Sequence, residues 1–564
     1  MLTRPWMIAA SLAALGCNAI FGIEPGQLAE GGAGGTGAAG ASGGAGATPE
    51  GGGPSGGGGA SCVDNDSQPC FEDDPQKANV GECSPGEQIC EGGVFGECVG
   101  QVLPTTEDCN DPGDEDCDGN ACSDVVWVKQ LSATDQVFAI VSGVGDDGSI
   151  LVAGSFEGEL DLGGEVLTSG GPAAFTAVLE ANGDVRWANA LPAGFLSGWA
   201  GFGPQGRVVV TSTFDQPLTF GGNTFAPLGI DIIVAALDSQ TGVPITAGRI
   251  GGPGEDNARV SVFPNGDLLL IGETDQGIDF GGSVGTLAPT VADVGAFVVR
   301  LTPSLQPVWG RLIEYEVPGD PTAPKVLASI FGDQVALATN YRARLVGDGC
   351  PFFGGNVSNL AVTLVGADGT IEWAACATGA VDPHGVSVAP DGSPTVLLSL
   401  SASTQLNPAV GPTINATPSG LPDLYLWKLG PNGATAWSKR YGDDQYQGLD
   451  EGAAFCLDHD SNGRLLVADA FQGSMDFGNG TVLQSEGEYD AFLATILPNG
   501  DTAWARSMGG PGPFQSFFSV AAVPTTNEII GSAFAAADID FGDGTVYSPA
   551  SGIGIDSFIV KFQP

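Results

Sequence analysis

The chain has 564 residues, too many for one ordinary core, so several domains or a repeat array are expected. It carries 66 acidic and 18 basic residues, a net charge of -48, which argues against nucleic acid and anionic lipid surfaces as partners. Such a surface attracts divalent cations or simply keeps the protein soluble. Gly, Val, Thr, Phe and Asp fill most of the chain, which favours an all-β protein of strands and turns.

The N-terminus is typical of an export signal. Arg4 precedes an apolar run over residues 8–15, which is too short to span a membrane. Its end resembles a bacterial lipobox, in which Cys17 is lipidated and becomes the mature N-terminus after residues 1–16 are removed. In that family Asn18 implies export to the outer membrane, where the acyl chains would anchor the protein. Ordinary signal cleavage, which leaves Cys17 without a role, is the alternative.

A tether follows the signal. Residues 31–60 contain 16 glycines among Ala, Ser, Thr and Pro, and nothing there can bury a core. We expect residues 17–61 to form a flexible coil with a root-mean-square reach of roughly 35–40 Å. It would lift the folded domains away from a membrane.

Residues 62–123 form a small cysteine-rich module. An even number of cysteines in an exported chain indicates a disulfide framework, with the pairing left open and zinc as the competing reading. Few large apolar residues occur here, so disulfide bonds are needed for stability. The candidates are Cys62, Cys70, Cys83, Cys90, Cys98, Cys109, Cys117 and Cys122.

The module ends in an acidic loop. Residues 61–124 hold 17 Asp or Glu and one basic residue, Lys77. Carboxylates at the first, third and fifth loop positions with Gly119 at the sixth make the first half of a calcium loop, although Val125 replaces the usual Glu at the twelfth. A solvated acidic loop is the alternative. The candidate calcium ligands are Asp114, Asp116, Asp118, Asn120 and Asp124.

The module carries a family resemblance. The runs 81–90, 96–98 and 103–109, ending in 114–119, resemble a cysteine-rich module of myxobacterial surface lipoproteins. The acidic end is similar to the metal-binding motif of MopE-type outer-membrane proteins. This resemblance implies a surface location and a metal site.

From residue 124 the chain repeats one unit. The unit reads strand, Asn-Gly or Asp-Gly turn, strand, Phe-Gly-Gly element, strand, turn and tryptophan strand, and these turns between apolar alternations indicate hairpins. The tryptophan position recurs every 59 to 67 residues. The markers are Trp127, Trp187, Thr246 in place of Trp, Trp309, Trp373, Trp437 and Trp504.

The phase of the repeat predicts a closed ring. The array opens with a lone Trp strand, 125–131, and ends with three strands, the last at 557–562. Pairing these two strands completes a four-stranded unit and leaves no open edge. Residues 124–564 are therefore predicted to form a seven-bladed β-propeller of four-stranded antiparallel blades, rather than a β-solenoid, whose repeats are shorter.

The repeats also resemble a known family. The Trp strand, the Gly-Gly-Pro-Gly runs at 251–254 and 509–512, and the Asp-Phe-Gly elements resemble the bacterial β-propeller repeats often called SBBP. That resemblance implies a fold and a surface location, and no activity.

Chemistry-bearing residues are few in the array. Cys350 and Cys376 are expected to pair, which leaves Cys456 buried and free. Neither His384 nor His459 lies in a nucleophile motif, and His384 is expected in a turn. No enzyme is therefore predicted.

One loop offers a weaker metal site. Asp458, Asp460 and Asn462 stand at the first, third and fifth positions and Gly463 at the sixth. The loop falls where other units have a plain hairpin turn, and the turn reading is favoured.

Three functions remain open at this stage. The first is a lipid-anchored, monomeric outer-membrane protein whose propeller binds an extracellular protein or polysaccharide, with a calcium-stiffened stalk. The second is a secreted polysaccharide hydrolase or lyase acting at the propeller mouth. The third is a purely structural spacer of the envelope.

Overall fold

The computed structural model describes residues 62–73, 75, 77–78, 83–105, 125–191, 199–315, 317, 321–342, 350, 358–379, 381–400, 404–406, 413–414, 423–443, 445, 447, 456–478, 480–550 and 554–564. These residues form strands and turns and contain no helix, so none that could cross a membrane. The described residues divide into two compact units, a smaller one before Ser123 and a larger one after Asp124.

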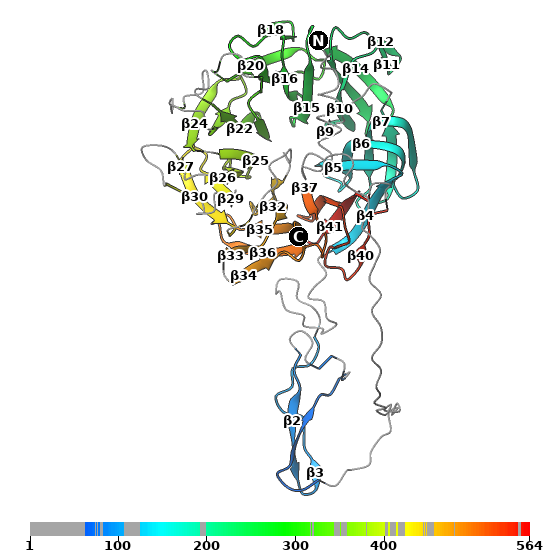
Figure 1. The fold of residues 1–564 in the computed structure, drawn as a ribbon, viewed down its shortest axis with the longest axis vertical. Helices are drawn as coiled ribbons and strands as arrows, with labels where there is room; N and C mark the ends of the chain where they lie inside the picture. Colours follow the sequence, from blue (N-terminus) through cyan, green and yellow to red (C-terminus); the bar gives the residue numbers. More distant parts are fainter. Residues whose placement is uncertain are drawn as a thin grey trace, which may run out of the picture. The chain divides into compact units, whose positions relative to one another are not determined.

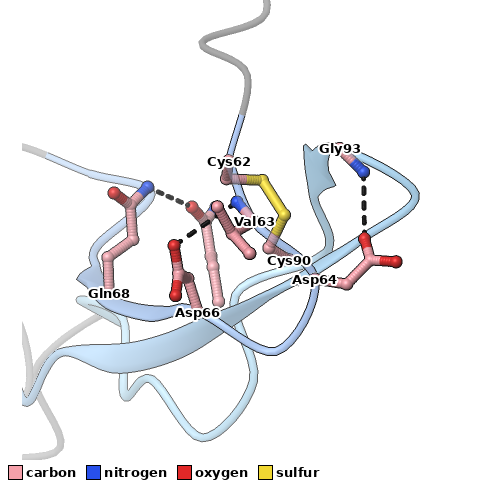
Figure 2. The surroundings of a disulfide bond; sticks show 8 residues. Cys62, Val63, Asp64, Asp66, Gln68, Cys90 and Gly93 are labelled. Atoms are coloured by element: carbon pink, nitrogen blue, oxygen red, sulfur yellow. Dashed lines mark hydrogen bonds between the residues drawn. A yellow bond between two sulfur atoms is a disulfide. The ribbon is translucent and has the colours of Figure 1, made fainter.

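The smaller unit is a three-stranded antiparallel sheet of β1 (Ser67–Cys70), β2 (Gly86–Glu91) and β3 (Val94–Phe95). Disulfides Cys62–Cys90 and Cys70–Cys98 hold it, each joining residues 28 positions apart. Figure 2 shows the first, beside short side-chain contacts such as Asp64 Oδ1 accepting from the Gly93 N–H at 3.2 Å. With so little apolar core, the disulfide bonds supply the stability of this unit.

The larger unit contains four-stranded antiparallel groups of strands, here named sheets A to G. Their strands follow in chain order from the innermost to the outermost, except in sheet G. Short further pairings, Ser132 with Asp161 and Ala377 with Leu406, connect sheet G to sheet A and extend sheet D. Sheet A is β5 (Gln136–Val144), β6 (Ile150–Asp161), β7 (Val166–Leu179) and β8 (Val185–Ala190); sheet B is β9 (Trp199–Gly203), β10 (Arg207–Phe214), β13 (Asp231–Asp238) and β14 (Pro244–Ile250); sheet C is β15 (Asp256–Val262), β16 (Leu268–Thr274), β19 (Gly295–Leu301) and β20 (Pro307–Ile313); sheet D is β21 (Val326–Phe331), β22 (Gln334–Tyr341), β23 (Asn359–Val365) and β24 (Ile371–Thr378).

The ring continues through three more sheets. Sheet E is β25 (Val381–Val388), β26 (Pro394–Leu400), β29 (Asp423–Leu429) and β30 (Thr435–Tyr441); sheet F is β31 (Leu457–His459), β32 (Leu465–Phe471), β35 (Asp490–Ile496) and β36 (Thr502–Met508); sheet G is β37 (Gln515–Ala522), β38 (Ile529–Ala535), β41 (Asp556–Phe562) and β4 (Val125–Ala133). Figure 1 shows the sheets succeeding one another around a ring, which is the arrangement of a β-propeller.

The sequence explains which strands lie inside. Third strands such as β19 and β35 are apolar at nearly every position and are buried along their whole length. Because a neighbouring sheet packs on both faces of these strands, apolar and polar residues do not alternate along them. Fourth strands are more accessible because they form the rim, and in β14 three of the seven residues are exposed. Apolar clusters join neighbouring sheets, as where Phe263 and Trp309 of sheet C pack with Val335 and Tyr341 of sheet D.

The predicted closure is confirmed. β4 pairs antiparallel with β41, with Leu131 opposite Ser557 and Val128 opposite Val560. Asp556 Oδ2 accepts hydrogen bonds of 2.6 Å from both Gln130 and Ser132, which ties the first strand to the last. The first strand of the larger unit, β4, therefore supplies the outermost strand of the last sheet.

Small hairpins lie between second and third strands, most of them at the Phe-Gly-Gly or Phe-Gly elements, and the sequence did not predict them. These hairpins are β11 (Leu218–Phe220) with β12 (Asn223–Phe225), β17 (Ile278–Asp279) with β18 (Thr286–Leu287), β27 (Thr404–Leu406) with β28 (Thr413–Ile414), β33 (Ser474–Gly478) with β34 (Thr481–Gln484), and β39 (Ile539–Asp540) with β40 (Val546–Tyr547). Several bridge back to the preceding sheet, as Asp279 does to Gly251 and Asp540 to Gly509. They add a second connection between neighbouring sheets.

Candidate ligand cavity

Outermost tryptophans join one sheet to a turn of the next. The indole N–H of Trp187 on β8 donates to the carbonyl oxygen of Ser239, in the β13–β14 turn, over 2.9 Å. The same contact, at 3.2, 2.8 and 3.0 Å, joins Trp127 with Ala181, Trp373 with Pro431 and Trp437 with Pro498. At these positions the tryptophan that marks the repeat forms a hydrogen bond between neighbouring sheets.

A glycine in the turn makes room for the ring. Gly242 has a φ of 68°, and a Cβ placed on it would lie 2.7 Å from the Trp187 ring. The Cβ built on Gly369 would lie 2.7 Å from Trp309. Only glycine meets both the positive φ and the close approach without cost. Tryptophan and glycine therefore form a matched pair across two sheets.

Sheets B and C depart from this pair at both positions. Thr246 on β14 pairs with Ala236, just before a bulge. Trp187 and Trp309 hold the same register position in their own sheets. The facing turn of sheet C has Leu305 in place of glycine, with a φ of 61°. A branched residue rarely adopts this backbone region. The absent indole leaves space into which the Leu305 side chain turns, next to Gly248.

A cavity of about 560 Å³ remains at this position. Its lining includes Thr246 and the turn residues Pro303, Ser304 and Leu305. Most of the remaining wall is apolar, with polar groups at a few points: Val209, Val234, Ala236, Ala247, Val262, Leu268, Gln205, Arg207 and Asn265. A mostly apolar cavity of this size with a few polar groups is the usual form of a small-molecule site.

A second cavity of about 430 Å³ adjoins the first and is more polar. Gly203, Pro204, Arg207 and Val262 line both. In the second cavity Arg186 is paired with Glu180 at 2.7 Å and with Asp147 at 3.4 Å. The Arg207 guanidinium, by contrast, has no ion pair or side-chain hydrogen bond within the described part of the chain. It is a cation available at the boundary of the two cavities.

Several predicted site residues lie outside the described residues. These are Cys17, Asp114, Asp116, Asp118, Asn120, Asp124, Cys109, Cys117 and Cys122. The lipid anchor and the calcium loop therefore stay predictions. Of the other candidates, Cys83 is disulfide-bonded, and Cys350 is bonded to Cys376 as expected.

The loop at Asp458, Asp460 and Asn462 is a hairpin turn between β31 and β32. Asp460 accepts hydrogen bonds from the Asn462 N–H at 2.9 Å and the Arg464 N–H at 2.8 Å, and pairs with the Arg464 guanidinium. Asp458 is used elsewhere, accepting from the Ala522 N–H at 3.0 Å. Among the described residues no group of three His, Cys, Asp or Glu side chains is arranged to hold a metal ion.

The expectation that His384 lies in a turn is wrong. It lies in β25, 2% exposed, at a bulge between Pro383 and Gly385. Its Nε2 is 3.0 Å from Ser399 Oγ, and its Nδ1 is 3.8 Å from Asp469 Oδ2. Pro and Gly beside it resemble a turn signal, but a bulge accommodates them within a strand.

His459 also links sheets E and F. Its Nδ1 lies 2.9 Å from Ser387 Oγ, and burial lowers the pKa of the ring to about 3. The Ser399, His384 and Asp469 set has the residue types of a hydrolase triad, but all three are over nine-tenths buried and line neither cavity. Both histidines fasten two sheets together.

No protein-family model and no curated protein matches the chain. Among solved structures, BamB from Moraxella catarrhalis is similar at a TM-score of 0.35 and 10% identity, over 78% of this chain and 99% of that one. Quinohemoprotein alcohol dehydrogenase from Comamonas testosteroni gives 0.34 and 10%, over 77% and 76%. Kuenenia stuttgartiensis hydrazine synthase gives 0.34 and 11%, over 69% and 92%. Likenesses this weak transfer neither an activity nor a ligand to this chain.

Proposed function

We propose that the chain is a lipid-anchored surface protein of the outer membrane whose seven-bladed propeller binds an extracellular ligand. The observation that carries this proposal is the cavity at Thr246. Four pairs of neighbouring sheets are joined by a tryptophan hydrogen bond, whereas the Thr246 position is hollow and lined mainly by apolar groups. A purely structural spacer has no need of such a gap.

The disulfides support the location. Cys62–Cys90, Cys70–Cys98 and Cys350–Cys376 are bonds that form and persist in oxidising, extracytoplasmic surroundings. Together with the lipobox-like end at Cys17 they favour an exported, anchored protein. The net charge of -48 suits a soluble propeller held off the membrane by a tether.

Binding is tested by asking what the protein retains. The protein purified from its native envelope is analysed by native mass spectrometry, beside the double variant Thr246→Trp with Leu305→Gly. This variant rebuilds the tryptophan and glycine pair and occupies the ring position of the cavity. A bound mass present in the wild type and absent from the variant is expected. Identical spectra for the two proteins would contradict binding at this cavity.

The calcium role of the cysteine-rich module is a separate proposal. Alternate carboxylates at Asp114, Asp116 and Asp118 are the ligands that calcium prefers, and extracellular calcium levels tolerate weak sites. Calorimetry of the purified protein should show binding that Asp116→Ala weakens and that Glu91→Ala, at an exposed position of β2, leaves unchanged. No heat at millimolar calcium would refute it.

A further inference from the structure

We propose that the Thr246 cavity binds a planar aromatic acid: a ring of indole size with a ring N–H donor, and a carboxylate that meets Arg207. This names the ligand class of the proposed function and rests on it. The repeat itself indicates the ligand, because other sheets of the same protein show which side chain occupies this space.

The shape of the cavity follows from the missing side chain. At the equivalent register position Trp187 inserts its ring between its own sheet and the turn of the next, and is 7% exposed there. Thr246 leaves the corresponding space in sheets B and C open. The walls are formed by strands fixed on both sides, so the slot is pre-formed for a flat ring and costs little to order.

The polar partner of the ring is also repeated. In four pairs of neighbouring sheets the indole N–H donates to a backbone carbonyl oxygen in the facing turn. The accepting residue lies about two positions before the turn glycine, as Pro431 lies before Gly433 and Pro498 before Gly500. Pro303 holds that position before Leu305 and lines the cavity. A ring that carries an N–H donor can therefore repeat the contact made by tryptophan.

The remaining volume calls for a substituent. A cavity of about 560 Å³ is larger than one ring requires, even with Leu305 turned into it. The wall beyond the ring position includes Arg207, which has no ion-pair partner within the described residues, whereas Arg249 pairs with Asp231 and Arg300 with Asp267. A guanidinium binds a carboxylate through two parallel hydrogen bonds.

Net charge sharpens this assignment. A protein of charge -48 repels anions at long range, so an anionic ligand needs a specific cation at its site. Salt screens the long-range repulsion between the protein and an anion. Where this repulsion dominates, affinity for the acid should increase with salt concentration, while affinity for the neutral ring changes little.

The experiment is calorimetry with indoleacetate and its neutral counterpart indole ethanol, using the full-length mature protein. The wild type should bind both and favour the acid. The double variant Thr246→Trp with Leu305→Gly should weaken both by about tenfold or more, while Leu305→Gly alone should retain binding, because it leaves the cavity open. Arg207→Gln should weaken the acid by about tenfold and leave indole ethanol unchanged.

The outcomes separate the two claims. If the wild type binds neither indole, the aromatic-acid assignment is overturned, and the retained mass from the native envelope still decides whether the cavity binds another ligand. If the double variant keeps wild-type affinity, the site is wrong. If Arg207→Gln weakens the two probes equally, the carboxylate contact is wrong. The thermal midpoint of each variant, expected at or above the wild type for the double variant, shows that the fold is intact.

Discussion

The indole nitrogen of Trp187 lies 2.9 Å from the carbonyl oxygen of Ser239 in the next sheet, and the ring covers Gly242 in the same turn. One side chain thus joins two units that are consecutive in sequence. This contact explains why the repeat keeps its tryptophan. Where Thr246 replaces the tryptophan, a cavity remains between the two sheets.

The first prediction concerns that contact. Trp187→Phe should lower the free energy of unfolding by about 1 kcal/mol, because the Ser239 carbonyl loses its donor. Trp187→Ala should lower it by about 3–5 kcal/mol, since it also empties a buried site. Denaturant unfolding measures both. Thr246→Ala, at the same register position in sheet B, is the control and should change stability by about 0.5 kcal/mol or less, because the cavity is already there.

The second prediction concerns closure of the ring. Deleting residues 124–131 removes most of β4 and exposes the edge of β41, whose backbone then lacks its partner. The thermal midpoint of the whole propeller should fall. Removing the same number of residues from the tether, within 31–60, is the matched control. A truncated protein that melts like the intact one would show that the first strand does not close the ring.

The third prediction concerns pH and Asp256. This side chain is 1% exposed, and burial raises the pKa of its carboxyl to about 6 from the ordinary 3.8, despite a 2.7 Å hydrogen bond from the Gly252 N–H. The folded state therefore binds the proton more tightly than the unfolded state does. Its contribution to stability is present below about pH 4 and is lost as the pH rises through about 6, a change of about 3 kcal/mol.

Asp256→Asn removes this pH dependence, because an amide does not titrate. The amide oxygen can still accept the hydrogen bond from the Gly252 N–H. The variant should be more stable than the wild type at about pH 7.5, and the difference should shrink towards about pH 4. Asp135→Asn, in an exposed turn, is the control. A difference that stays constant between these two pH values would contradict the raised pKa.

The fourth prediction concerns the disulfide between Cys350 and Cys376, which closes a loop of 26 residues in sheet D. Replacing both by Ala should lower the free energy of unfolding by about 3 kcal/mol, because the unfolded chain gains freedom. Cys350→Ala alone should have a similar effect, since either change opens the bond. Equal midpoints for wild type and double variant would mean that the bond does not restrain the propeller.

Much of the fold follows from the sequence because its signals are local and repeated. The tryptophan period and the hairpin turns predicted the sheets, and the phase at the two ends predicted the β4–β41 pairing. The small hairpins were missed, since two- and three-residue strands such as β17 and β39 give no periodic signal.

The candidate site was only half visible in the sequence. Thr246 was read as a substitute for tryptophan, but the cavity also depends on Leu305, 59 residues later, at a turn position where other units have glycine. That pairing emerges only when neighbouring sheets are placed side by side. His384 was misread for a related reason, because its partners Ser399 and Asp469 come from two further strands.

The central claim is that the open tryptophan position between sheets B and C is the ligand site. Hydrogen exchange of the purified protein with and without indoleacetate tests it directly. We expect added protection in β14 around Thr246 and in the turn at 302–306, with sheets E and F unchanged. Protection confined to any other part of the ring, with none at these two segments, would contradict it.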